Sequence, residues 1–133
     1  MTTAWLDTNV VVRFLTRNPI ELAERADRLL SKAQAGEIAF RLTPIVVAEI
    51  VGVLKTVYGL GTAEIATGVS ALLQADGILA DQRDTLLAAL DLMLEQRVAF
   101  PDAFVAVSAR QADEPVCTFD RGFNRLGVDI ISS

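Results

Sequence analysis

The segment Trp5-Leu6-Asp7-Thr8-Asn9-Val10 decides the fold of this chain. Trp5-Leu6 is typical of a short strand, and it leads directly into Asp7, Thr8 and Asn9, which are residue types that cap the first turn of a helix. The apolar run that follows predicts a helix from Val10 to Leu15. A strand that passes at once into a helix is typical of a chain in which strands and helices alternate.

The same alternation continues to the C-terminus. Helical periodicity and short apolar runs between Gly, Asn and Pro predict the remaining elements. The expected helices are Glu21–Ala35, Pro44–Val57, one that begins at Thr62, 83–96 and Pro101–Ala112, and the expected strands are Ile38–Leu42, Ile78-Leu79, Val116–Phe119 and Val128–Ile131. Short strands separated by helices imply a parallel sheet with helices on both faces. We therefore expect the α/β class and, at this length, a single domain over residues 1–133.

The composition excludes several kinds of site. The chain has no histidine and one cysteine, Cys117, which excludes a His/Cys zinc site, an imidazole base and an intramolecular disulfide. The net charge of −5 argues against a large basic surface for nucleic acid, although the acids are concentrated in residues 76–102. No apolar run is long enough for a membrane span, and Asp7 precedes any apolar stretch long enough for a secretory signal. We expect a soluble, cytoplasmic protein whose chemistry uses oxygen ligands and hard metal ions.

Four acidic residues differ from the acids on polar helix faces. Asp7 and Asp120 each follow a predicted strand, and α/β proteins bind ligands beyond the carboxyl ends of their strands. Glu49 is the only charged residue in the apolar helix segment Ile45–Leu54, which predicts a buried carboxylate that needs a partner. Asp102 lies in the first turn of a helix, among apolar neighbours.

Each of these acids also has an ordinary structural explanation. Asp7 could cap a helix, Glu49 could pair with an arginine, Asp102 could interact with a helix dipole and Asp120 could cap a turn. If all four lie at one edge of the sheet, they form a concentrated negative site that is costly without a cation. Mg²⁺ or Mn²⁺ is the expected ion, because both prefer carboxylate and water ligands.

At these residues the chain resembles the PIN-domain nucleases, and within them the VapC-type toxins of bacterial and archaeal toxin–antitoxin pairs. The matching segments are Leu6-Asp7-Thr8-Asn9-Val10, Val47-Ala48-Glu49-Ile50, Pro101-Asp102-Ala103-Phe104 and Thr118-Phe119-Asp120-Arg121-Gly122-Phe123. Their order and spacing fit over the whole chain. The resemblance implies a three-layer α/β/α sandwich with a central parallel sheet of about five strands, and Mg²⁺- or Mn²⁺-dependent cleavage of RNA that inhibits translation and growth. It also implies a small DNA-binding antitoxin as partner, and a homodimer.

The resemblance also assigns roles to individual residues. The family's acidic quartet, which is catalytic and holds the metal, corresponds to Asp7, Glu49, Asp102 and Asp120. The small polar residues that support it correspond to Thr8, Asn9 and Thr118. Some relatives carry a further acid where this chain has Gly122.

A mechanism and its phosphate contacts can be outlined from the same residues. Asp7 and Asp102 are expected as the principal ligands of a cation that activates water, and Glu49 is expected to orient or deprotonate that water. The candidates for contacting RNA phosphates are Arg13, Arg17, Arg121 and Arg125. The alternative for these arginines is an ordinary solvated surface.

Three other functions remain as alternatives. A dehalogenase-like phosphatase also begins with a strand and an aspartate, but it needs an acid where Asn9 stands and a lysine near a strand end, and neither Lys32 nor Lys55 is so placed. An RNA-processing nuclease without an antitoxin would have the same site. A catalytically inactive binding module would keep the fold, although it would have no reason to retain the quartet.

Overall fold

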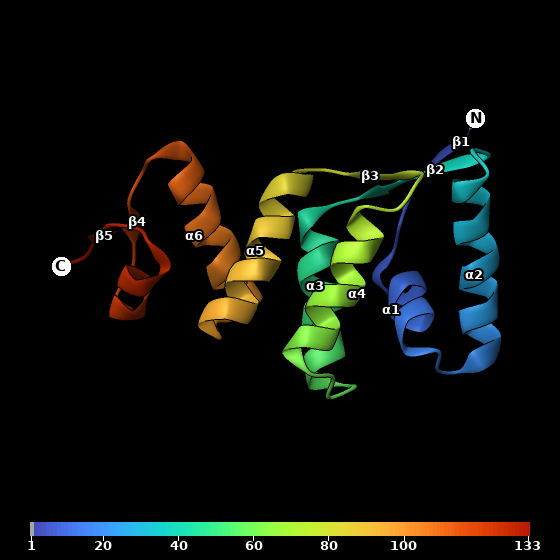
Figure 1. The fold of residues 1–133 in the computed structure, drawn as a ribbon, viewed down its shortest axis with the longest axis horizontal. Coiled ribbons are helices and arrows are strands. Elements are labelled where there is room, and N and C mark those ends of the chain that lie inside the picture. Colours follow the sequence, from blue (N-terminus) through green and yellow to red (C-terminus); the bar gives the residue numbers. More distant parts are fainter. Residues whose placement is uncertain (1) are drawn as a thin grey trace. The chain divides into compact units, whose positions relative to one another are not determined.

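A computed structural model describes residues 2–133 as two compact units, one ending at Arg83 and the other beginning at Asp84 (Figure 1). The first unit contains β1 (Thr2–Trp5), α1 (Thr8–Thr16), α2 (Ile20–Gln34), β2 (Ile38–Leu42), α3 (Pro44–Thr56), α4 (Thr62–Leu73) and β3 (Ile78–Ala80). The second contains α5 (Arg83–Gln96, apart from its first residue), α6 (Phe100–Ala112), β4 (Val116–Cys117), the 3-10 helix η1 (Arg121–Leu126) and β5 (Ile130–Ile131). In the described chain no helix combines the length and the apolar character needed to cross a membrane.

The strand pairs are all parallel, which confirms the α/β class predicted from the sequence. In the first unit β1 pairs with β2, where Trp5 lies opposite Arg41, and β2 pairs with β3, where Arg41 lies opposite Leu79. In the second unit β4 pairs with β5, where Val116 lies opposite Ile130. The predicted strands are thus present, as a three-stranded ladder in one unit and a two-stranded ladder in the other.

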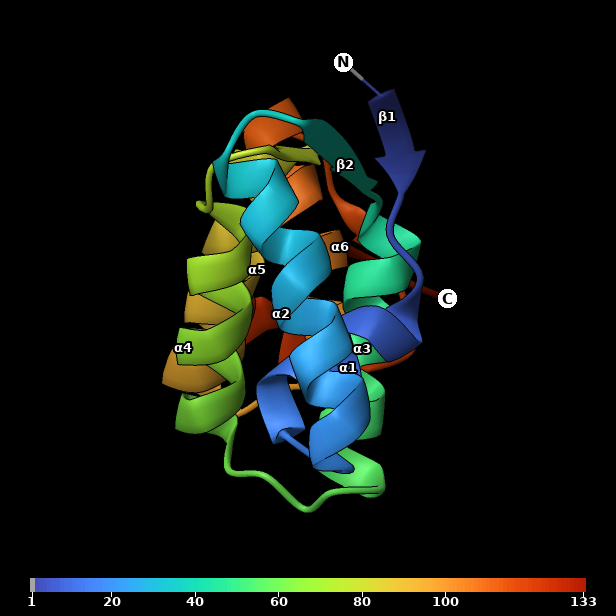
Figure 2. The same ribbon diagram turned by 90° about the vertical axis from the view of Figure 1, so that its right-hand side faces the viewer.

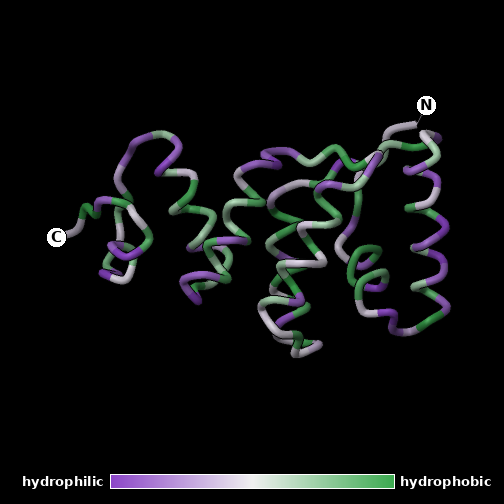
Figure 3. The backbone as a smooth tube through the Cα atoms, in the orientation of Figure 1, coloured by the Kyte–Doolittle hydropathy of each residue, from purple (hydrophilic) through white to green (hydrophobic). Residues whose placement is uncertain are grey.

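Helix α1 packs between α2 and α3 in the first unit, as the two ribbon views show (Figures 1 and 2). Val11 and Val12 of α1 are at most 1% exposed, and the small residues Ala23 and Ala26 of α2 are buried as well. Hydrophobic and hydrophilic residues alternate along α2, as expected for a helix with one solvated face (Figure 3). Because α1 is held in this way, the segment that enters it from β1 has a fixed position.

The boundaries at the first strand differ slightly from the prediction. The strand ends at Trp5, but the amide of Leu6 still donates a hydrogen bond to the carbonyl of Arg41 at 2.9 Å. Helix α1 begins at Thr8 rather than Val10, because Asp7 takes the N-cap position with an extended backbone. The passage from strand to helix is therefore even shorter than predicted.

The last two strands are shorter than predicted, and the expected strand through Phe119 is wrong in length. The ladder ends after the amide of Thr118 donates to the carbonyl of Ile131 at 3.1 Å. The chain then turns, since the amide of Asp120 donates to Oγ1 of Thr118 at 3.0 Å, and Phe119 is 90% exposed. Apolar residue types predict a strand but do not show where a side-chain hydrogen bond interrupts it.

Helix α3 presents one stripe to solvent, so the predicted burial of Glu49 is wrong. Ile45, Glu49 and Gly52 are exposed at helical spacing, and Ile45 is 80% exposed. Val47 and Ile50 on the other faces are fully buried, where α3 packs against α1 and α4. The sequence of α3 is apolar nearly all round, but its neighbours cover only part of its circumference.

Two isoleucines of α3 test this orientation. We expect Ile50→Ala to lower the free energy of unfolding by about 2–5 kcal/mol, because the side chain is fully buried. Ile45→Ala, the same substitution on the exposed stripe, should change it by no more than about 0.5 kcal/mol. Urea unfolding of both variants measures the difference, and equal losses would contradict the orientation of α3.

Candidate active site

Asp7 is placed by the passage from β1 into α1. Its backbone is extended (φ −93°, ψ 150°) at the N-cap, but its side chain makes no capping hydrogen bond. Leu6 and Thr8 on either side are buried, at 6% and 4% exposure, whereas Asp7 is exposed. The N-cap explanation therefore accounts for the backbone of Asp7 and leaves its carboxylate available to a ligand.

The predicted neighbours of Asp7 on α1 have different environments. Thr8 is buried in the first turn, while Asn9 is exposed and lines a cavity of about 250 Å³ formed by residues of α1 and α2. Arg13 also lines this cavity, but its guanidinium donates to Oη of Tyr58 at 2.6 Å and to the carbonyl of Asn18 at 3.1 Å. Arg13 thus connects α1 to the segment that follows α3.

Glu49 is exposed on α3, in the same unit as Asp7. Among residues 2–133 it has no ion-pair partner, so the expected alternative of a pair with an arginine does not occur. Helices α1 and α3 pack against each other, which makes α3 a neighbour of the helix that Asp7 begins. An exposed carboxylate without a partner can bind a cation or a water molecule at little desolvation cost.

Asp102 lies in the first turn of α6, half-buried beside an aromatic pair. The rings of Phe100 and Phe104 are 6.4 Å apart, and Phe100 is 3% exposed. Ala99 at the N-cap offers no side-chain acceptor, so the first amides of α6 are left to other acceptors. The structural explanation of Asp102, a carboxylate at the positive end of a helix, therefore fits as well as a role in binding a metal.

Asp120 and Thr118 form one hydrogen-bonded turn between β4 and η1. The amide of Asp120 donates to Oγ1 of Thr118 at 3.0 Å, and Oδ1 of Asp120 accepts from the amide of Gly122 at 2.8 Å. In the described chain Oδ2 of Asp120 has no hydrogen-bond partner. Thr118 is therefore linked directly to Asp120, and its supporting role in a metal site stays a prediction.

The quartet is divided between the two units, with Asp7 and Glu49 in the first and Asp102 and Asp120 in the second. Within each unit, over residues 2–133, no three acidic or cysteine side chains form a group that could hold a metal ion. The donor chemistry of the four residues nevertheless fits Mg²⁺ or Mn²⁺, because all four are carboxylates and none of them forms an ion pair within the described residues.

The remaining candidate arginines differ in whether they already have hydrogen-bond or ion-pair partners within the protein. Arg17 forms a bidentate pair with Asp27, at 2.6 and 2.7 Å, and Arg125 hydrogen-bonds the carbonyl and side chain of Gln96. Arg121 is exposed and has no recorded partner within the described chain. Among the four candidates, Arg121 is therefore the one free to contact a phosphate without breaking an existing interaction.

The Arg17–Asp27 pair also has a defined pH dependence. The hydrogen bond to Asp27 raises the pKa of Arg17, and the hydrogen bond from Arg17 lowers the pKa of Asp27. Because the folded pKa of Asp27 is lowered, the pair contributes stability above the ordinary pKa of aspartate and loses it as the pH falls through the lowered value. Both side chains are well exposed, so the contribution is small.

A cavity of about 510 Å³ at the carboxyl ends of β1, β2 and β3 was not predicted. Its lining includes Trp5, Arg41, Asp81 and Arg83, and the guanidinium of Arg41 lies 5.8 Å from the Trp5 ring. Trp5 is 70% exposed, although the sequence suggested only a strand residue. A charged residue within the apolar strand Ile38–Leu42 is the signal that could have indicated this polar edge.

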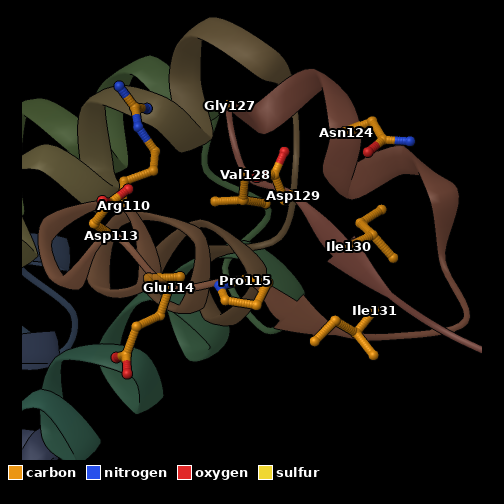
Figure 4. Close-up of a pocket in the computed structure, with 11 residues that line it drawn as sticks. Arg110, Asp113, Glu114, Pro115, Asn124, Gly127, Val128, Asp129, Ile130 and Ile131 are labelled. Atoms are coloured by element: carbon orange, nitrogen blue, oxygen red, sulfur yellow. The ribbon is translucent and has the colours of Figure 1, made fainter.

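A second cavity, of about 780 Å³, lies in the second unit at the end of α6 (Figure 4). Its charged lining residues are Arg110, Asp113, Glu114 and Asp129. None of the predicted site residues is among the residues that line it, so this cavity is separate from the quartet.

The parallel α/β fold and the position of Asp7 after a strand are consistent with the protein family that matches this chain. The PIN domain family matches residues 4–129, and the chain belongs to this family. PIN domains are generally nucleases, and they typically use a divalent metal. Among solved structures, the chain is similar to the crystal structure of VapBC2 from Rickettsia felis bound to a DNA fragment from their promoter, with 17% sequence identity over 98% of each chain and a TM-score of 0.40. A search of curated proteins found no match.

Two cap positions distinguish a functional carboxylate from a structural one. We expect Asp7→Asn to change the free energy of unfolding by no more than about 0.5 kcal/mol, because its side chain makes no capping hydrogen bond. Thr43→Ala should cost about 0.5–2 kcal/mol, because Oγ1 of Thr43 accepts from the amide of Val46 at the start of α3. Denaturant unfolding compares the two, and a larger loss for Asp7→Asn would show that this carboxylate has a structural role.

Proposed function

We propose that this protein is a Mg²⁺- or Mn²⁺-dependent endoribonuclease, formed as one PIN domain over residues 1–133. The observation that carries the proposal is Asp7, an exposed and uncapped carboxylate at the carboxyl end of a parallel strand in a chain of a nuclease family. Its fixed backbone and free side chain are what a metal ligand requires.

We assign the cation to the acidic quartet, with Asp7 and Asp102 as principal ligands and Asp120 and Glu49 completing the set. When bound, a divalent cation lowers the pKa of a water molecule and offsets charge on the phosphate. The free Oδ2 of Asp120 and the unpaired carboxylate of Glu49 support this assignment, because neither is occupied by another side chain.

The acid–base chemistry falls to carboxylates, since the chain has no histidine. We assign Glu49 to orienting or deprotonating the attacking water, because it is exposed and unpaired. Thr118 accepts a hydrogen bond from the backbone of Asp120, and we assign Thr8 and Asn9, in the first turn of α1, the same supporting role for Asp7. Arg121 is the preferred contact for an RNA phosphate, and Arg13, Arg17 and Arg125 would have to exchange their present partners.

The biological role that we propose is the toxin of a toxin–antitoxin pair, cytoplasmic and homodimeric, with a small DNA-binding antitoxin as partner. The order of the four motifs within so short a chain supports this role. An RNA-processing nuclease with the same site is the second candidate. An inactive binding module is disfavoured, because the exposed carboxylates of Asp7 and Glu49 serve no folding purpose.

Metal-dependent cleavage is the direct test of the reaction. Purified, partner-free protein should cleave total RNA into discrete products in Mg²⁺ or Mn²⁺, and EDTA should abolish cleavage. Asp7→Asn and Asp102→Asn should each lower the cleavage rate by about 100-fold or more, because each removes a charged ligand. Gel analysis of labelled RNA measures the rate, and undiminished cleavage in excess EDTA would rule out the metal assignment.

Expression in bacteria separates the toxin from the processing nuclease. Induction of the wild-type chain without a partner should arrest growth, whereas the Asp7→Asn variant, which we expect to fold normally, should not. Co-expression of a reading frame that lies directly upstream of the gene should restore growth if it encodes the antitoxin. Normal growth with soluble protein that cleaves RNA in vitro would instead favour the processing nuclease.

A further inference from the structure

We propose that Gly122 is a positioning residue for Asp120: because it has no side chain, its backbone N–H can hold the Asp120 carboxylate in the orientation used for metal binding. This inference rests on the proposed function, since it concerns one of the acids assigned to the cation. It adds to the site a residue that has no reactive group of its own.

The contact between the two residues is short. The amide of Gly122 donates to Oδ1 of Asp120 at 2.8 Å. A Cβ atom on Gly122 would lie 2.9 Å from the same oxygen and 3.6 Å from Cγ and Oδ2 of Asp120. A separation of 2.9 Å is well inside the contact distance of carbon and oxygen, so any side chain at this position forces the carboxylate to shift.

The backbone of Gly122 does not itself require glycine. The positive-φ glycines of the described chain are Gly36, Gly59, Gly77 and Gly127, and Gly122 is not among them. An alanine could therefore adopt the backbone conformation at 122 without strain. The three atoms nearest to the added methyl group all belong to the carboxyl group of Asp120, so this group is what the glycine accommodates.

Asp120 is held from several sides, and one oxygen remains free. Its amide donates to Oγ1 of Thr118 at 3.0 Å, and its carbonyl accepts from the amide of Phe123 at 3.3 Å. With Oδ1 bound to the amide of Gly122, rotation of the carboxylate is restricted, and Oδ2 has no partner within the described residues. Metal-binding carboxylates are commonly braced in this way by a hydrogen bond to one oxygen.

The same geometry shows what an acid at position 122 would meet. An aspartate there would place its Cβ against Oδ1 of Asp120 and add a second negative charge beside it. With an acid at 122, the carboxylate of Asp120 would have to move away from its present position.

The alternative explanation is that the hydrogen bond from Gly122 to Asp120 only caps η1. The affinity for a metal ion distinguishes this explanation from a role in positioning a ligand. If the hydrogen bond only caps η1, Gly122→Ala lowers stability and leaves metal affinity unchanged. If Gly122 positions a ligand, Gly122→Ala weakens Mn²⁺ binding by about 10-fold or more, as expected when a hydrogen bond to a ligand is lost.

The experiment compares the full chain with Gly122→Ala and with the control Gly61→Ala. Gly61 also has an ordinary backbone conformation, and a Cβ there would lie 3.9 Å from Oε1 of Glu64, which is a normal contact. Titration with Mn²⁺, followed by electron paramagnetic resonance, measures affinity without any need for RNA cleavage. We expect weaker binding for Gly122→Ala and wild-type binding for Gly61→Ala, and wild-type binding for both would overturn the proposal.

A double-mutant cycle with Asp120→Ala tests the contact without metal. Gly122→Ala should lower the thermal midpoint of the wild type but not that of Asp120→Ala, because the clashing carboxyl group is then absent. If Gly122→Ala alone fails to fold, recovery of folding in the double variant supports the same clash. Equal destabilisation in both backgrounds would overturn it. Failure of the proposed function would look different, since the wild-type chain would then bind no Mn²⁺ and cleave no RNA.

Discussion

The candidate site depends on the short passage from strand β1 into helix α1 at Asp7. Leu6 and Thr8 are almost fully buried on either side, and the Leu6 amide continues the ladder to Arg41. The backbone therefore has no freedom at Asp7, while the side chain has no structural partner. A carboxylate held by its backbone alone can bind a ligand without first breaking an interaction, which is the general advantage of a preorganised site.

Asp120 also has a restricted backbone and one free carboxylate oxygen, but different interactions restrict it. No helix of comparable length follows it, so burial cannot fix its backbone as it does at Asp7. Hydrogen bonds take this role instead, from Asp120 to Thr118 and from Gly122 to Asp120. The two strand-end aspartates thus illustrate two solutions to one problem, which is to restrict a carboxylate while leaving an oxygen free.

The basic side chains show how the fold limits the choice of binding residues. Three of the four arginines considered for RNA have partners within the protein: Arg13 with Tyr58, Arg17 with Asp27 and Arg125 with Gln96. These interactions connect helices or order loops. An exposed ion pair such as Arg17–Asp27 contributes little stability, so either side chain can form a different interaction at little cost. Of these four arginines, Arg121 alone has no hydrogen-bond or ion-pair partner within the described residues.

By itself the sequence determined the order and type of the elements and the place of the acids along the chain. Ile38–Leu42 and 83–96 are predicted with their observed bounds, because their periodicity and flanking residues agree with one another. The position of Asp7 between a strand and a helix is also a local pattern and is predicted, whereas the strand expected to lead directly into Asp120 ends earlier, at Cys117.

Only the tertiary structure decided which side chains are free. Glu49 lies in a helix that is apolar nearly all round, and its exposure depends on which faces α1 and α4 cover. The partner of Arg13 is Tyr58, 45 residues further along the chain, and the partner of Arg17 is Asp27 on the next helix. Contacts between elements decide which side chains are buried and which form hydrogen bonds or ion pairs. The residue types along a single element do not predict these contacts.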